Sequence, residues 1–275
     1  MRTLASAAAL AALFLAGSAT AQEPGSYVPA PPGPFEPVRR DPLGTRLVNG
    51  STPFPVAART LEVLFTHRFN QPINDSSSHD LWGLDSGADT GIGLALGITH
   101  HLDVSLYRSS FQEDFELAGK FLFLEQASRV PLTLSLRAGA DLLRQPGVAD
   151  SSRPFAQLLV ARRLAPGVNV LVSPSWAADT PRLKDAFNVP LGLTFPLPGH
   201  YLVELEYVPA NRDLDDSRQA WHVAFSKALG GHIFEIVVGN SRATTVDQML
   251  GGDSAAGFNT GDIRLGFNIV RDFRF

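Results

Sequence analysis

The chain contains no cysteine. This absence excludes disulfide bonds, metal sites built on thiolates, cysteine nucleophiles and attachment of a lipid through an N-terminal cysteine. The chain also has little excess charge, with a formal net charge of −4 over 275 residues and no dense cluster of Lys and Arg. It therefore lacks the electrostatic footprint of a nucleic-acid-binding protein, and we expect no nucleic-acid partner.

Long apolar runs are missing after the first twenty residues. The run at residues 4–17 follows Arg2 and precedes Ala19-Thr20-Ala21, a small-x-small cleavage site. It is shorter than the roughly 20 residues that a spanning helix needs. We expect residues 1–21 to be a signal peptide that is cleaved on export. A mature chain without an apolar helix can cross a membrane only as a closed barrel, because each backbone polar group needs a partner there.

Residues 22–57 are rich in proline and have little apolar periodicity. Proline cannot donate to a strand ladder, and this segment has no regular apolar face to bury. We interpret residues 22–57 as a largely disordered periplasmic leader, either a plain linker or a segment that binds peptidoglycan or a partner.

From Thr60 onward, apolar and polar residues alternate with a period of two, which predicts β-strands with one apolar face. The clearest example is GDIRLGFNIVRDFRF at residues 261–275, where Ile263, Leu265 and Phe267 share one parity. Its aromatic ending resembles the signature that bacterial assembly machinery reads on outer-membrane barrels, so we expect that machinery as a partner. About twelve strands can be counted, an even number as single-chain bacterial barrels require.

The connections between these strands alternate in length. Long polar ones, such as 70–86 and 241–259, follow odd strands, and short ones, such as 99–101 and 230–231, follow even strands. This asymmetry is typical of extracellular loops and periplasmic turns, and a soluble sandwich has no reason to keep it. The sequence therefore predicts an all-β fold over residues 58–275, a transmembrane antiparallel up-and-down β-barrel of about twelve strands in a bacterial outer membrane.

Large aromatic residues on the outward parity cluster near both ends of the predicted strands, with mostly aliphatic residues between. Such clusters are expected of girdles at the two membrane interfaces, in contact with outer-membrane lipid. The predicted upper girdle consists of Phe69, Phe115, Trp176, Phe187, Tyr207 and Trp221, and the lower one of Phe123, Phe195, Tyr201 and Phe275.

Three segments of the chain also resemble a known protein family. TLEVLFTHRF (60–69), LWGLDSGADTGIGLALGIT (81–99) and LDVSLYRSSFQEDFELAGKFLFL (102–124) resemble an uncharacterised bacterial β-barrel family, domain of unknown function fifty-seven seventy-seven. The resemblance covers about residues 59–275 and is most specific in the first four strands. It implies an exported outer-membrane barrel and brings no established activity and no catalytic residues.

The predicted inward face carries charges of both signs. Such charges can pair and close a small barrel, or they can line a narrow aqueous pathway. Candidates for setting solute selectivity are Glu62, Arg68, Asp103, Glu116, Lys120, Arg137, Asp141, Glu204, Glu206, His222 and Arg264, with Glu235 and Asp272 on the same parity. Glycines and alanines of the second strand leave space beside them.

Catalytic and metal sites have weak support. His67, His79, Ser105 and Ser110 are available to a barrel hydrolase, but no strand places a Ser and a His at a recognisable spacing. We predict no catalytic residue and expect no enzyme.

Two prompts for a metal site are His100-His101, in a tight turn, and the loop trio His79, Asp80 and Asp85. Adjacent histidines in a turn often point apart, and the loop carboxylates match no calcium-binding spacing. We therefore predict no metal ligand and no cofactor. The distinctive segment GLDSGAD (83–89) is best interpreted as a tight turn into the second strand.

The leading functional hypothesis is a porin-like narrow channel or transporter for a small solute. The alternative is a non-conducting structural or partner-binding barrel that acts through the long loops at 70–86 and 241–259. A barrel hydrolase is the third alternative.

Overall fold

The computed structural model describes residues 44–127, 129–144, 147, 149–181, 184–199, 201–211, 214, 217–252 and 262–275. The chain divides into two compact units, residues 1–32 and 33–275, and every described residue belongs to the second. The expected signal peptide at 1–21 and the part of the expected leader at 22–43 lie outside the described residues, so both stay predictions.

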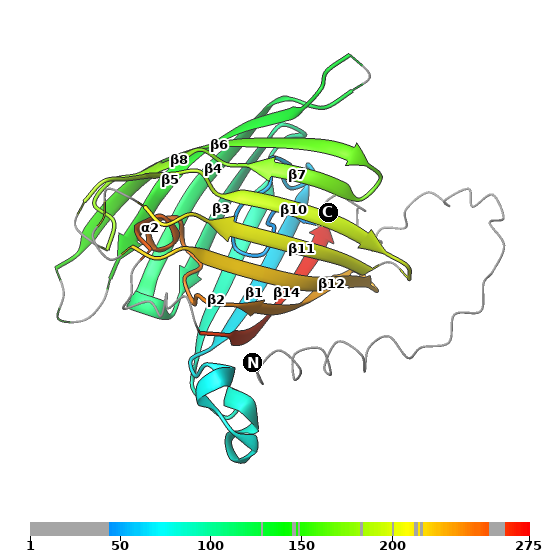
Figure 1. The fold of residues 1–275 in the computed structure, drawn as a ribbon. Coiled ribbons are helices and arrows are strands. Elements are labelled where there is room, and N and C mark those ends of the chain that lie inside the picture. The colour runs from blue at the N-terminus through cyan, green and yellow to red at the C-terminus, as the bar shows by residue number, and fades with distance from the viewer. Residues whose placement is uncertain are drawn as a thin grey trace. The chain divides into compact units, whose positions relative to one another are not determined.

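The described residues after 58 form a closed antiparallel β-barrel (Figure 1). Most strands pair with the strands next to them in the chain, and β1 pairs with β14, which closes the ring. The strands are β1 (Thr60–Phe69), β2 (Ala88–Gly97), β3 (Leu102–Ser109), β4 (Asp114–Leu124), β5 (Thr133–Leu143), β6 (Ser151–Ala165), β7 (Val168–Val172), β8 (Ser175–Ala177), β9 (Ala186–Asn188), β10 (Leu191–Leu197), β11 (Tyr201–Val208), β12 (Ala220–Leu229), β13 (His232–Gly239) and β14 (Arg264–Arg274).

Two of the barrel's strands are interrupted. β7 and β8 both pair with β6, while β9 and β10 pair with β8 and β7 respectively. Pro174 and Pro190 lie in the two gaps, where the missing proline N–H breaks the ladder. Counted as continuous elements, the described strands make a twelve-stranded barrel, which confirms the predicted fold class.

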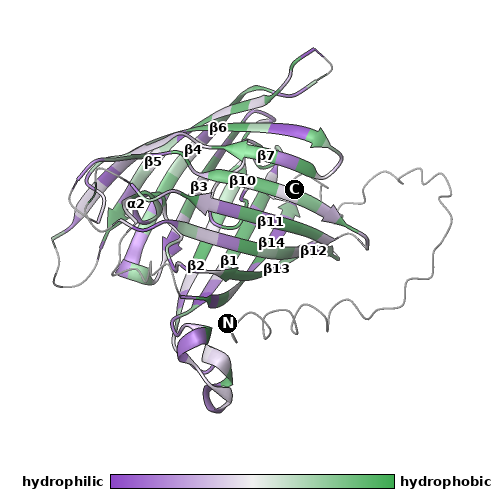
Figure 2. Cartoon of the chain, viewed as in Figure 1, coloured by the Kyte–Doolittle hydropathy of each residue, from purple (hydrophilic) through white to green (hydrophobic). Residues whose placement is uncertain are grey.

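Burial alternates along the strands in the manner of a membrane barrel. In β1, side chains of one parity are buried inside and those of the other are partly exposed outside, and Figure 2 shows hydrophobic stretches along most strands. All ten predicted girdle residues have outward parity and lie near strand ends. Phe187 and Phe123, from opposite ends of the barrel, are 57% and 55% exposed. Contact of these aromatics with the membrane interfaces stays a prediction.

Residues 44–57 differ from the sequence-based expectation, because they are ordered inside the barrel. Leu47 N donates to Gly50 O (2.8 Å), and Thr52 N donates to Thr45 O (2.9 Å). We call residues 45–52 the lumenal hairpin. The leader interpretation is wrong for this part of the chain, because the prolines at 53 and 55 lie beyond the hairpin and the inner wall supplies partners for its backbone.

A second segment enters the lumen from the other end. We call residues 240–252, between β13 and β14, the inserted loop; it carries α2 (Val246–Gly251), whose residues are all buried. Figure 1 shows α2 within the ring of strands, and it packs against β6, β8 and β9. The hairpin is continuous with the start of β1 at the short-turn end, whereas the inserted loop belongs to the long-loop end.

The other helices of the described residues are short and lie in connections. They are η1 (Ile73–Asp75) and η2 (Ser78–Gly83), between β1 and β2, and η3 (Phe111–Glu113), between β3 and β4. Ser77 and Asp80 form a capping box at the start of η2, so the loop has its own local order. Helices of a length and hydrophobicity suited to crossing a membrane are absent from the described ranges.

Candidate functional site: the occupied lumen

The predicted lumen charges lie where the alternation placed them. All eleven candidates for solute selectivity are buried, from Asp141 and Glu204 at 0% exposure to Arg264 at 7%. Glu235 is also buried. Isolated charges at such depth would be costly, so their partners decide what the lumen can do. Whether any of these residues selects a solute stays a prediction.

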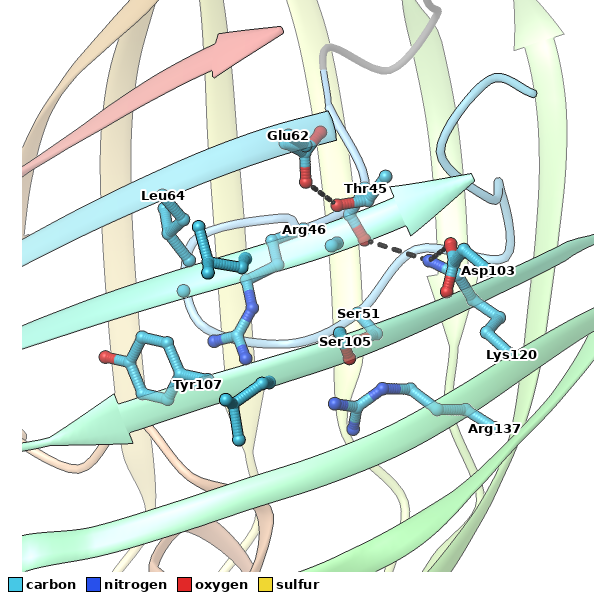
Figure 3. A pocket seen from close by; sticks show the side chains of 14 residues that line it. Thr45, Arg46, Ser51, Glu62, Leu64, Asp103, Ser105, Tyr107, Lys120 and Arg137 are labelled. Atoms are coloured by element: carbon cyan, nitrogen blue, oxygen red, sulfur yellow. Dashed lines mark hydrogen bonds and ion pairs between the residues drawn. The ribbon is translucent and has the colours of Figure 1, made fainter. Parts of the chain in front are cut away.

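The legs of the lumenal hairpin bind charged groups near the short-turn end (Figure 3). Thr45 Oγ1 donates to the carboxylate of Glu62. Lys120 Nζ lies 3.5 Å from Asp103 Oδ2 and donates to Thr52 O over 3.2 Å. The backbone N of Val56 also donates to Asp103 Oδ2, over 2.8 Å. Wall charges therefore hold both the hairpin and the segment that leads to β1.

Glu206 on β11 holds the tip of the hairpin. Its Oε2 accepts from Gly50 N (2.6 Å) and from Asn49 N (3.0 Å), and its Oε1 accepts from Asn49 Nδ2 (3.3 Å). His222 Nδ1 lies 3.3 Å from Glu206 Oε1. Arg68 completes the tip contact by donating to Asn49 Oδ1 over 2.7 Å. One wall carboxylate thus accepts three hydrogen bonds from two residues of the tip.

Glu116 on β4 joins the hairpin, the wall and the inserted loop. Its Oε1 lies 3.1 Å from the Arg46 guanidinium of the hairpin and 2.5 Å from that of Arg137 on β5. Its Oε2 accepts from Val246 N of α2 over 3.0 Å. Arg46 also donates to Thr244 O (3.3 Å), so the two inserted segments touch near the middle of the lumen.

The space that the second strand's glycines leave is filled by Tyr107. Its hydroxyl lies 2.7 Å from Thr66 Oγ1, and the Arg46 guanidinium lies over its ring, 4.6 Å from the centroid. A Cβ on Gly91 would fall 1.9 Å from the tyrosine oxygen, so only glycine admits this ring position. Gly93 also lies under the ring.

Apolar contacts accompany the polar ones. Leu47 and Val48 of the hairpin pack with Ala161, Leu171 and other inward residues. In the same way Val246 and Leu250 of α2 pack with Phe155 of β6 and neighbouring alanines. Two small cavities lie beside the hairpin among the described residues. One of about 30 Å³ lies near Tyr107 and Lys120, and one of about 40 Å³ lies against the inserted loop.

The inserted loop is anchored to the wall at the long-loop end. Arg242 binds Asp89 Oδ2 (2.7 Å) and Asn70 Oδ1 (2.8 Å). The segment GLDSGAD (83–89) thus has two roles. Gly83 ends η2 with a positive φ of 88°. Asp89 binds the inserted loop, a contact between distant segments that sequence spacing does not reveal.

Three carboxylates meet beside α2. They are Asp114 on β4, Asp141 on β5 and Asp247 on α2, and one oxygen from each lies within 4.8 Å of the others. Asp247 N donates to Asp141 Oδ2 (3.0 Å), and Arg153 binds Asp247 Oδ2 (2.6 Å). Asp114, Asp247 and Arg153 are absent from the sequence-based candidates. Among the described residues, this is the one group of three or more acidic or histidine ligands close enough to share an ion.

The weaker sequence candidates are not brought together. His67 points outward and stacks on Phe267 with 4.8 Å between ring centroids, whereas Ser105 lines a lumen cavity. Ser110 Oγ accepts from Thr90 N, and His79 lies exposed in η2. Neither His100-His101 nor the trio of His79, Asp80 and Asp85 belongs to the described carboxylate group.

The chain matches one protein family and is similar to several solved structures. No curated protein matches the chain. Among solved structures, the barrel is similar to outer membrane phospholipase A from Escherichia coli (12% identity, TM-score 0.45, covering 77% of this chain and 89% of that one). It is also similar to Omp33 of Acinetobacter baumannii (10% identity, TM-score 0.41, 79% and 98%) and to Salmonella typhi OmpF (7% identity, TM-score 0.37, 78% and 96%).

The family described as "Membrane bound beta barrel domain" (DUF5777) matches residues 43–273, a range that begins just before the lumenal hairpin and therefore includes it. This is the family that the first four strands resemble. The chain is a membrane-bound β-barrel and belongs to the DUF5777 family.

Proposed function

We propose that this protein is a gated outer-membrane channel for small solutes, closed at rest by the lumenal hairpin. The observation that carries the proposal is how the hairpin is held. Its tip and legs bind wall charges, chiefly Glu206, Glu62 and Lys120, through groups that water can also satisfy. Such contacts exchange for hydration at a modest net cost, about 0.5–1.5 kcal/mol for a neutral hydrogen bond and 1.5–3 for one to a charged group.

The apolar contacts of the hairpin favour the closed state. Leu47 and Val48 are 3% and 1% exposed, and moving each into water would cost about 1.5–3 kcal/mol. Together with the polar contacts, these apolar contacts keep the hairpin in the lumen at rest. Because the hairpin precedes β1, it can leave through the short-turn end without breaking a strand of the ring.

The open pathway is expected to prefer cations. The described inward carboxylates, namely Glu62, Asp103, Asp114, Glu116, Asp141, Glu204, Glu206 and Glu235, outnumber the inward Arg and Lys side chains Arg68, Lys120, Arg137, Arg153 and Arg264. Rings of carboxylates favour cation passage. The inserted loop narrows the same lumen from the other end, so we expect a small conductance.

Shortening the hairpin tests the proposal. Residues 46–51 are replaced by Gly-Gly, which keeps the backbone pairing of Thr45 with Thr52. A matched control replaces Ser78–Gly83 of η2 by Gly-Gly, removing the same number of residues from a connection outside the lumen. Single-channel recordings in planar bilayers should give rare openings for the wild type and the control, and sustained conductance for the shortened hairpin.

The alternative function is a non-conducting structural or partner-binding barrel. The filled lumen is the observation that favours it, because a wall braced from inside needs no pathway. It predicts that the shortened hairpin variant, folded as judged by heat-modifiable migration on a denaturing gel, never conducts. That result would overturn the channel proposal.

A further inference from the structure

We propose that Asp114, Asp141 and Asp247 form a binding site for a divalent cation of the calcium type, which fastens the inserted loop to the barrel wall. The proposal does not depend on whether the barrel conducts. Two of the ligands stand on adjacent wall strands, and the third stands on α2 of the inserted loop. A cation bound to all three would therefore connect a loop to the wall.

The spacing of the carboxylates fits one calcium ion. One oxygen of each aspartate lies within 4.8 Å of the others. Calcium binds oxygens at about 2.3–2.6 Å, so ligands on opposite sides of the ion are separated by up to about twice that distance. Magnesium requires about 2.0–2.1 Å and near-ideal octahedral geometry, so it tolerates less variation in the placement of its ligands. The ligands offer no nitrogen or sulfur, the atoms that zinc prefers.

Unpartnered oxygens provide a second, independent observation. Asp114 Oδ1, Asp141 Oδ1 and Gln248 Oε1 have no hydrogen-bond partner among the described residues, and all three residues are 0% exposed. The Gln248 amide lies beside the group, where its Nε2 donates to Asp114 Oδ2 over 3.3 Å. Buried polar atoms without a partner are rare and costly, and a bound cation would satisfy oxygens of this kind.

The charge balance also calls for a cation. In the part of the chain that the structure describes, one guanidinium binds the three carboxylates, that of Arg153 on Asp247. The next carboxylate, Glu116, is already matched by Arg46 and Arg137. The aspartate group with Arg153 therefore carries two uncompensated negative charges when ionised, the charge that one divalent ion neutralises. The excess negative charge can also be removed by protons shared among the carboxyl groups. A measurement of calcium binding distinguishes a cation site from such shared protons.

The test is calcium binding by the full chain, purified in detergent and stripped with a chelator. Isothermal titration calorimetry with CaCl₂ should give one site per chain, with a dissociation constant at or below about 1 mM, the weak end of known protein sites. Calcium should also raise the unfolding temperature and protect the inserted loop from protease. Magnesium at the same concentration should bind more weakly; equal binding would overturn the assignment to calcium.

Variants locate the site. Asp141→Asn and, separately, Asp114→Asn should each weaken calcium binding at least tenfold and abolish the calcium-dependent rise in unfolding temperature. The matched control is Asp89→Asn, which removes the ion pair between the wall and Arg242 of the same loop but leaves the three aspartates intact. It should loosen the loop and keep the calcium affinity.

Wild-type protein that binds no calcium at millimolar concentration, with an unfolding temperature that neither calcium nor chelator changes, would overturn the proposal in favour of shared protons. Equal calcium affinity in the wild type and both folded aspartate variants would overturn the location. Because the two aspartates stand on different strands, failure of one variant to fold leaves the other to decide.

Discussion

Replacing Glu206 by Gln is expected to open the barrel. In the closed state the Glu206 carboxylate accepts from Asn49 N, Gly50 N and Asn49 Nδ2 of the hairpin tip. A glutamine amide offers one acceptor oxygen, and its NH₂ group would face a donor on Asn49. The substitution therefore removes at least one charge-assisted bond and leaves a neutral bond in place of another.

The size of the effect follows from these contacts. Hydrogen bonds to charged groups contribute about 1.5–3 kcal/mol each and neutral ones about 0.5–1.5. The net loss to the closed state is about 2–4 kcal/mol, since part of the interaction survives in the variant. With tenfold per 1.4 kcal/mol, the ratio of open to closed barrels should rise by about 30- to 700-fold.

The assay is the open probability of single barrels in a planar bilayer at fixed voltage. Glu204→Gln is the matched control: Glu204 is the preceding inward residue of β11, and the hydrogen bond that the structure gives its carboxylate comes from Ser226 on the wall, not from the hairpin. Equal open probabilities for Glu206→Gln and wild type, or an equal rise in both variants, would refute the role of the tip contact.

Other expectations follow from the same structure. Under a tenfold KCl gradient, the reversal potential of the opened barrel should lie closer to the equilibrium potential of K⁺ than to that of Cl⁻. A reversal potential closer to that of Cl⁻ would contradict the cation preference inferred from the lumen charges. Gly91→Ala should destabilise the barrel by about 1–3 kcal/mol in urea unfolding, because the new methyl group displaces Tyr107. Gly119→Ala should change stability little, because the atom nearest to its added Cβ is 3.9 Å away. Equal effects of the two substitutions would exclude this explanation. Deleting Phe275, whose N donates to Arg59 O (3.0 Å) where β14 meets β1, should reduce the heat-modifiable fraction, and unchanged assembly would exclude a role for this contact.

The ring of strands could be predicted because its physics is local. A wall between lipid and lumen requires alternation with a period of two, so residues such as Leu61 and Glu62 reveal their faces without knowledge of their neighbours. The long and short connections then give the direction of each strand. All eleven predicted selectivity candidates are consequently buried inside the barrel, as is Glu235.

The sequence does not show which residues of β6 face the lumen and which face outward, and the inserted loop explains why. Phe155 and Leu159 face inward although they are apolar, while Leu158 faces outward, so both faces of the strand read as apolar. Phe155 is inward because α2 brings Val246 and Leu250 against it. A large apolar residue at a lumen-facing position of a strand therefore indicates that another segment of the chain packs against it inside the barrel.

The hairpin was missed because its proline-rich surroundings dominated the interpretation of residues 22–57. The short stretch TRLVNGST lacks the length of a strand, and its backbone partners are side chains such as Glu206, more than 150 residues away. The aspartate group was missed for a related reason. Asp114, Asp141 and Asp247 come from three elements, and their meeting depends on strand stagger and on the path of a loop, neither of which periodicity encodes.

The central claim is that the lumenal hairpin closes a pathway, and a reversible lock tests it most directly. The native chain has no cysteine, so Thr45→Cys combined with Glu62→Cys places the only two thiols at residues whose side chains are in contact between hairpin and wall. We predict that single barrels of this variant are silent when oxidised and conduct after a reductant is added. Equal open probabilities for the reduced barrel and for a barrel whose disulfide is confirmed by mass spectrometry would contradict the account.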